Sequence, residues 1–365
     1  MKVGILGTRG IPNNYGGFEQ FAEYFSRRLV QQGVEVWVYN SHNHPYRQSD
    51  WNGVHIVHCF DPEYLIGSAG PFVYDLNCIL DSRKRDFDVV LQLGYASSSV
   101  WRWFLPSGVK VVTNMDGIEW SRSKYNCALK YFIKKAERWA VRSSDLLVAD
   151  SPQIMEYFQA NYNITSRFIP YGAEILEKPD ETVPEHFNLK PDSYYLAISR
   201  IQPDNNTEVI IKGFLESGSL LPLLLIGSIN HRYGKYLQSK YKSENIRFIG
   251  GIFDVNLLNQ LRYFSRLYFH GHSSGGTNPS LLEAMASKAL ICAHDNRFNR
   301  LILGSDAFYF NSGHQIADII RNNPGKIEHS NFARNNVEKI KDTYQWDLIT
   351  DSYIEAFSGL LKAKN

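Results

Sequence analysis

The segment HGHSSGGTNPSLLEAMASK, residues 270–288, has the residue types and spacing of an anion-binding helix start. It follows an apolar run, and the Gly-Gly-Thr of residues 275–277 suits a loop. Asn278 can cap a helix, and Pro279 suits its first turn. The N–H groups there favour an anion, and Glu283, about one turn further on, could bind ribose hydroxyls. The alternative is a capped helix whose Glu283 is a solvent-facing carboxylate.

A second loop, GTRGIPNNYGGFE at residues 7–19, follows the first predicted strand. Gly16 and Gly17 open the next predicted helix, where backbone N–H groups could approach an anion. The spacing is neither GxGxxG nor GxxxxGK[ST], which excludes a dinucleotide fingerprint and a Walker loop. The length of the loop favours a ligand over a tight turn without one.

Arg200, in SRIQPDNN, ends the first predicted strand of the second half of the chain. A guanidinium at a strand end can hold a diphosphate by paired hydrogen bonds. The alternative is a surface arginine that only ends a strand.

These segments need a scaffold that places strand ends beside helix starts. A strand at 2–7, an amphipathic helix at 18–32 and a strand at 34–40 form a β–α–β unit, which predicts a parallel sheet. Further predicted strands are 54–59, 89–93, 109–114, 146–150, 168–169, 194–199, 221–226, 247–249, 267–271, 290–293 and 308–310. This alternation predicts an α/β fold with two tandem Rossmann-like domains facing across a cleft.

The predicted boundaries follow the composition. An N-terminal domain covers 1–173, and a proline-containing stretch with few large apolar residues, 174–192, is a predicted linker. A C-terminal domain covers 193–343, and an amphipathic helix closes the chain at 344–365.

The composition excludes several protein classes. The chain has 365 residues, 44% of them hydrophobic, and a net charge of +2, so we expect a globular protein without a nucleic-acid partner. Its apolar runs are far shorter than the roughly 20 residues of a membrane span, and its start lacks a signal core, so we expect a cytoplasmic protein. The four cysteines are scattered, and we expect no metal site.

Residues 120–142 combine positive charge with aromatic rings. Between residues 122 and 142 there are seven Lys or Arg and a single acid, Glu137. The aromatic residues of the stretch are Trp120, Tyr125, Tyr131, Phe132 and Trp139. A basic helix of this kind predicts peripheral contact with the inner face of the cell membrane, and WRWF at 101–104 could add an anchor. The alternative is a solvated helix whose rings pack inward.

The order of the motifs resembles that of a known family. The two-domain plan with SR…P from Ser199 and NPSLLEAMA from Asn278 resembles the retaining, nucleotide-sugar-dependent glycosyltransferases of family 4, which have the GT-B fold. TRGIPNNYGGFE, MDGIEWSRSKY, IPYGAE and GGTNPSLLEAM resemble more narrowly the rhamnosyltransferase branch with a distinctive N-terminal domain. The resemblance covers nearly the whole chain and makes the N-terminal domain the acceptor side.

The resemblance implies roles for the matching residues. The donor-binding residues that it implies are Gly16, Gly17, Arg200, Asn278, Pro279, Ser280, Leu281, Leu282 and Glu283. Arg200 would neutralise the diphosphate, the amides of 279–282 would hold phosphate, and Glu283 would hold the ribose. Asp116 falls near the transferred sugar. Arg200, Asp116 and Glu19 are the candidate catalytic residues, and the two carboxylates would orient the acceptor or assist its proton transfer unless they are simple turn and helix caps.

Two positions depart from the family pattern. Gly275 stands where relatives carry the first of two glutamates, and Asn205 stands where many carry a lysine. We interpret both as features of the branch.

The resemblance implies metal-independent transfer of a deoxyhexose, L-rhamnose from dTDP-β-L-rhamnose, onto a lipid-linked saccharide in cell-surface polysaccharide biosynthesis. The alternatives are a nucleotide-sugar epimerase of the same fold and a non-catalytic transferase-like binding subunit. We expect Arg200→Ala and Glu283→Ala each to weaken donor use and to leave the fold intact.

Overall fold

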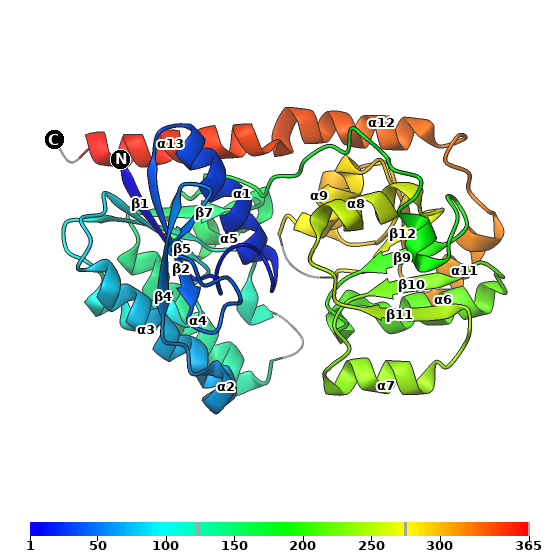
Figure 1. The fold of residues 1–365 in the computed structure, drawn as a ribbon, viewed down its shortest axis with the longest axis horizontal. Helices are drawn as coiled ribbons and strands as arrows, with labels where there is room; N and C mark the ends of the chain where they lie inside the picture. The colour runs from blue at the N-terminus through cyan, green and yellow to red at the C-terminus, as the bar shows by residue number, and fades with distance from the viewer. Residues whose placement is uncertain (122–124, 274–275, 364–365) are drawn as a thin grey trace. The chain divides into compact units, whose positions relative to one another are not determined.

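The computed structural model describes residues 1–121, 125–273 and 276–363, which form two α/β units (Figure 1). The first unit comprises Met1–Tyr171 and Trp346–Asn365, and the second comprises Gly172–Gln345. Every predicted strand is present, with ends within two residues of the prediction. The predicted α/β fold class is therefore confirmed.

The first unit contains an eight-stranded sheet in the order β3-β4-β2-β1-β5-β6-β7-β8. Its strands are β1 (Lys2–Leu6), β2 (Glu35–Ser41), β3 (Asp50–Trp51), β4 (Val54–Cys59), β5 (Val89–Leu93), β6 (Lys110–Asn114), β7 (Leu146–Ala149) and β8 (Arg167–Phe168). All strand pairs are parallel except that of β3 with β4, which is antiparallel. The carboxyl ends of the parallel strands therefore share one edge. The sequence analysis did not predict β3.

Helices cover both faces of this sheet (Figure 1). They are α1 (Gly17–Gln31), α2 (Glu63–Ile66), α3 (Gly70–Ser82), α4 (Cys127–Ser143), α5 (Pro152–Tyr162) and α13 (Trp346–Lys362), with 3₁₀ segments η1 (Gly67–Ala69), η2 (Ser98–Phe104) and η3 (Glu119–Ser121). On one face, Tyr74 and Cys78 of α3 pack against Leu6 and Val90. On the other, Phe25 of α1 packs against Tyr353 of α13, so the C-terminal helix completes the first unit.

The second unit contains a parallel six-stranded sheet in the order β11-β10-β9-β12-β13-β14. Its strands are β9 (Tyr195–Ile198), β10 (Leu223–Ile226), β11 (Ile246–Gly250), β12 (Leu267–His270), β13 (Ile291–His294) and β14 (Phe308–Phe310). Its helices are α6 (Thr207–Ser217), α7 (Arg232–Lys240), α8 (Val255–Phe264), α9 (Pro279–Ala286), α10 (Arg297–Leu303), α11 (Gly313–Arg321) and α12 (Ser330–Lys339), with 3₁₀ segments η4 (Pro184–Phe187) and η5 (Pro203–Asn205) and a π-helical turn η6 (Ile340–Tyr344). Helices α6, α7 and α11 share one core cluster with the strands.

The stretch 174–192, predicted to be a linker, packs on the second unit. The Leu176 amide donates to the Ala286 carbonyl at 3.1 Å. The Gln260 side chain accepts from the Asp180 amide and donates to the Lys178 carbonyl. These bonds attach the stretch to α8 and α9.

Across the described part of the chain, the helices are too short or too polar to span a bilayer.

Truncating Phe357 tests whether α13 is part of the first unit's core. Phe357 is fully buried, so Phe357→Ala should lower the free energy of unfolding by about 3–5 kcal/mol through lost contacts and a cavity. Leu348, exposed on the same helix, is the control, and Leu348→Ala should change stability by less than about 1 kcal/mol. Urea denaturation followed by circular dichroism measures both. Equal midpoints for the two variants would contradict this role of α13.

Candidate functional site

The loops after β9 and β12 are joined at the carboxyl edge of the second sheet. The Asn206 side chain donates to the Gly271 carbonyl at 2.8 Å, and the Ser273 amide donates to the Asp204 carbonyl at 3.0 Å. A Cβ on Gly271 would lie 2.1 Å from the Asn205 carbonyl oxygen. Any side chain at position 271 would therefore push the two loops apart.

Arg200 lies in the first of these loops with its side chain exposed. Among the described residues, no hydrogen bond or ion pair engages its guanidinium. Its carbonyl accepts from the side chain of Asn205, which is buried, at 2.7 Å. Asn205 thus supports, from inside the protein, the loop that carries Arg200.

The start of α9 differs from the prediction of free amides. The Asn278 side chain accepts from the Ser280 amide at 3.0 Å, and the Asn278 carbonyl accepts from the amides of Leu281 and Leu282. Pro279 has no amide hydrogen, and the Leu281 and Leu282 side chains are buried. An anion beside positions 279–282 would therefore interact with the helix dipole rather than with unpaired N–H groups. Gly275 lies outside the described residues.

Glu283 faces the protein interior, which excludes the alternative of a solvent-facing carboxylate; its predicted contact with a ribose stays a prediction. The residue is 5% exposed, and its carboxylate lies 2.5 Å from Nη2 of Arg262, which is 1% exposed. Arg262 also donates to Asn259 at 2.7 Å and to Ser280 Oγ at 3.0 Å. The Tyr268 hydroxyl pairs with the same Ser280 oxygen at 2.9 Å. This buried network fixes α9 against α8 and β12.

The sequence analysis missed Arg262, although its position gives a signal. Arg262 follows the buried Leu258 by four residues on α8 and therefore lies on the inward side of that helix. An arginine on the apolar side of a helix needs a buried acceptor, because an isolated buried charge is very costly. Glu283 is that acceptor.

Two stacked histidines lie at the end of β12, where His270 is the last residue of the strand and His272 follows it. The rings of His270 and His272 lie 4.5 Å apart. Burial lowers the pKa of His270 well below its ordinary value, and His272 and Arg262 lower it further. His270 is therefore neutral at physiological pH. Within residues 1–121, 125–273 and 276–363, no group of His, Cys, Asp and Glu is placed to hold a metal ion.

In the first unit, Glu19 supports the loop between β1 and α1. Its carboxylate accepts from the Arg9 amide at 2.7 Å and from the Thr8 hydroxyl at 3.3 Å. Burial raises the pKa of Glu19, and these hydrogen bonds oppose the rise. The carboxylate is thus committed to the loop rather than presented at the surface.

The glycines that this loop requires are Gly7 and Gly10 rather than Gly16 or Gly17. Gly7 has φ of 88°, and a Cβ there would lie 2.3 Å from the Leu93 carbonyl oxygen. Gly16 is extended, a conformation open to any residue, and Gly17 is exposed at the start of α1. The two predicted donor-binding glycines are accessible, but the backbone does not require glycine at position 16.

Asp116 lies directly beyond the end of β6 in a left-handed conformation, with φ of 51°. Its amide donates to the Asn114 side chain at 2.9 Å, and its carboxylate accepts from the Tyr171 hydroxyl at 3.0 Å. Asp116 remains the better placed of the two candidate carboxylates.

The aromatic rings of residues 120–142 mostly pack inward. Four of them, Trp120, Tyr125, Phe132 and Trp139, pack against the core cluster of α4 and α5. Glu137 is buried and accepts hydrogen bonds from three tyrosines: Tyr95, Tyr157 and Tyr162. The rings that remain exposed are Tyr131 and, on neighbouring η2, Trp103 and Phe104; Trp103 is 79% exposed.

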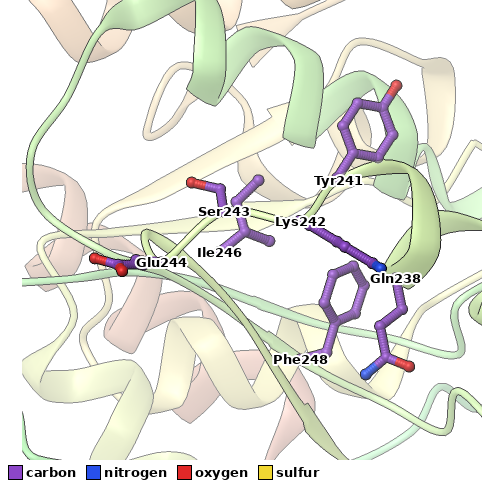
Figure 2. Close-up of a pocket in the computed structure, with 7 residues that line it drawn as sticks. All are labelled: Gln238, Tyr241, Lys242, Ser243, Glu244, Ile246 and Phe248. Carbon is purple, nitrogen blue, oxygen red and sulfur yellow. The ribbon is translucent and has the colours of Figure 1, made fainter.

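A surface hollow of about 480 Å³ lies beside the edge strand β11. Its lining includes Gln238, Tyr241, Lys242 and Phe248 (Figure 2). The hollow includes Ile246, the first residue of β11, and so lies toward the amino end of the strand. It is separate from the loops that carry Arg200 and α9.

Comparison with known proteins identifies the type of fold. Residues 1–174, less than half of the chain, match the family model "Domain of unknown function (DUF1972)". No curated protein sequence matches the chain. Sucrose-phosphate synthase from Thermosynechococcus elongatus is similar with a TM-score of 0.77 at 13% identity, covering 99% of each chain. The chain has the GT-B fold.

Two further structures agree with this fold. HepE from Anabaena, in complex with UDP-glucose, has a TM-score of 0.76 at 14% identity and covers 98% of this chain and 99% of its own. An α,α-trehalose-phosphate synthase from Burkholderia xenovorans, in complex with glucose-6-phosphate, has a TM-score of 0.73 at 10% identity and covers 98% of this chain and 100% of its own.

The buried ion pair changes the expected effect of Glu283→Ala. The substitution leaves Arg262 buried without its carboxylate, so we expect a loss of about 3–5 kcal/mol in the free energy of unfolding. The control is Glu338→Ala, which removes a surface pair with Lys341 and should cost at most about 1 kcal/mol. Urea denaturation of each full-length variant measures the difference. Wild-type stability in Glu283→Ala would show that the pair does not hold α9.

Proposed function

We propose that the chain is a retaining glycosyltransferase that takes its sugar from a nucleotide-diphosphate donor. The observation that carries the proposal is Arg200, an exposed guanidinium at the carboxyl edge of the second sheet, on a loop fastened to the one that leads into α9. In α/β sheets this edge is where ligands bind. The likeness to HepE, whose structure contains UDP-glucose, supports a nucleotide sugar as the ligand.

The chemistry asked of these residues is electrostatic. The bond from the sugar carbon to the diphosphate breaks, the acceptor oxygen bonds to the same carbon from the same face, and the acceptor proton passes to the leaving phosphate. Arg200 and the dipole of α9 would stabilise the negative charge that develops, and one such preorganised donor contributes about 3 kcal/mol. Asp116 would contact the transferred sugar, and no step is assigned to a metal.

For the substrates we propose dTDP-β-L-rhamnose as donor and a lipid-linked saccharide as acceptor. The support is the set of motifs shared with the rhamnosyltransferase branch, TRGIPNNYGGFE and MDGIEWSRSKY among them. The buried Asn205 also favours a catalytically active protein over a non-catalytic one, because its side chain holds the loop that carries Arg200.

Titration with nucleotide sugars tests this function. We expect dTDP-β-L-rhamnose to raise the melting temperature of the full chain. Arg200→Ala should weaken its binding by about 10-fold to 100-fold, because a charge-assisted hydrogen bond is lost. Arg321→Ala, which removes an exposed arginine of α11, is the matched control and should bind as the wild type does.

Three results would contradict the proposal. These are a lack of binding by every nucleotide sugar tried, wild-type binding in Arg200→Ala, and turnover of donor without any acceptor, which would indicate an epimerase. Donor binding without transfer to any acceptor would support a non-catalytic subunit instead.

We further propose that α4 and η2 contact the inner face of the cell membrane, where a lipid-linked acceptor would lie. Tyr131, Lys135, Arg138 and Arg142 follow one another at helical spacing on α4 and are exposed. The exposed Trp103 of η2 is linked to α4 through Arg102, whose guanidinium lies near the rings of Trp103 and Trp139. Positive charge beside exposed rings suits an anionic bilayer surface.

Vesicle binding tests this surface. Lys135→Glu with Arg142→Glu should weaken binding to vesicles of phosphatidylcholine and phosphatidylglycerol by at least about thirtyfold, since each basic residue contributes about 1 kcal/mol. Lys178→Glu with Lys190→Glu makes the same change of net charge on the second unit and is the control. Sedimentation with the vesicles measures binding. Equal loss in both double variants would show a non-specific charge effect.

A further inference from the structure

A buried carboxyl group of α3 has no role in the function described above. Asp75 lies on the inward side of that helix and is 6% exposed. Its Oδ2 accepts from the Ser97 hydroxyl at 2.5 Å, and Ser97 lies shortly after the end of β5. Because Ser97 follows the carboxyl end of β5, it lies at the carboxyl edge of the first sheet. Helix α3 packs against Val90 of the same strand, and its Asp75 reaches Ser97 at that edge.

Other buried polar groups lie on the sheet face that α3 covers and in the η2 segment after β5. Gln92 is paired in register with Leu6, so its side chain is on the sheet face that α3 covers. Gln92 is 3% exposed, and its Nε2, like the hydroxyl of the buried Ser99, has no hydrogen-bond partner among the residues that the structure describes. Buried polar atoms of this kind are usually satisfied by an ordered water molecule or by a group of a bound ligand.

Arg9 contributes a third such group from the loop after β1. Its Nη2 lies 2.7 Å from Glu63, while its Nε is buried without a hydrogen-bond partner in the described part of the chain. Its guanidinium carbon is 5.6 Å from the ring centre of Tyr15, which is exposed. An exposed ring beside polar groups offers a face to the C–H groups of a sugar.

The charges around the carboxyl select the kind of ligand. Asp61, Glu63 and Asp75 supply three carboxyl groups to the one guanidinium of Arg9, and the charges of Arg9 and Asp61 act on Asp75. An anionic group such as a phosphate would meet net negative charge there. Hydroxyl groups can donate to a carboxylate and accept from Gln92 and Arg9 at the same time.

We propose that the first unit binds an uncharged saccharide portion of the acceptor at Asp75, Ser97 and Gln92, beside Arg9 and Tyr15. The role as an acceptor site rests on the proposed glycosyltransferase function. Asp75 positions a hydroxyl group by accepting its hydrogen, and Gln92 donates to a neighbouring oxygen. The Tyr15 ring packs against the sugar.

The test measures sugar binding without any nucleotide, so that its result is independent of donor binding by the second unit. Saturation-transfer NMR on the full chain uses methyl α-D-glucopyranoside, methyl α-D-galactopyranoside and methyl α-L-rhamnopyranoside as probes, with glucose 6-phosphate for comparison. We expect at least one methyl glycoside to bind. Asp75→Asn should weaken that binding by about tenfold or more, because the charged hydrogen-bond acceptor is lost.

Two further variants separate recognition from folding. Asp81→Asn makes the same chemical change on the same helix, where Asp81 bonds Tyr39 and Arg85, and should keep wild-type affinity. Ser97→Ala keeps the carboxyl and should also weaken binding. Melting temperatures verify that each variant is folded, and Asp75→Asn removes a buried charge, which favours folding.

The pH dependence gives a readout that a structural role would not change. Burial raises the pKa of Asp75 to about 6, against the opposing hydrogen bond of Ser97. The carboxylate is therefore protonated as the pH falls, and wild-type affinity should drop between about pH 7 and pH 5, while that of Asp75→Asn stays flat. Failure of every methyl glycoside to bind, equal affinity in Asp75→Asn, or tighter binding of glucose 6-phosphate would overturn the proposal.

Discussion

The close approach of two backbones at Gly271 is the constraint on which the second unit's candidate site depends. Only a residue without a Cβ lets the Asn205 carbonyl come so near, and the hydrogen bonds of Asn206 and Ser273 then join the two loops. The joined loops bring the exposed Arg200 and the chain leading into α9 together at one sheet edge. Beneath them, Arg262 and Glu283 hold α9 by a buried ion pair that is costly to break.

The two units position their candidate site residues by different interactions. In the second unit, the buried ion pair of Arg262 and Glu283 holds α9, and the guanidinium of Arg200 is exposed. In the first unit, the buried Glu19 and Gly7 hold a loop. The Nε2 of Gln92, which has no hydrogen-bond partner among the residues that the structure describes, lies on the sheet face that α3 covers. An exposed cation suits a diphosphate, whereas hydrogen-bond donors beside several carboxyl groups suit hydroxyls, and for this reason we propose a different substrate for each unit.

Much of the fold was predictable because short buried strands of a parallel sheet are continuous apolar runs. The strand β3 was missed because it has two residues, although the Asn52-Gly53 turn that follows is a recognised hairpin signal. The segment 174–192 has a linker's composition, but its backbone finds partners on α8 and α9, which composition does not reveal. The aromatic rings near α4 have the spacing of either a membrane face or a core face, and packing placed four of them inward.

The sequence by itself determined where strands end, where α9 begins and that Arg200 follows a strand, because these features depend on local periodicity, caps and turn residues. Tertiary structure alone decided that Glu283 turns inward to Arg262, that the Asn205 side chain supports the loop of Arg200, and that Asp75 meets Ser97. Periodicity shows which side of a helix or strand faces the interior. It does not show which polar groups meet there, because those partners come from distant parts of the chain and are chosen by packing.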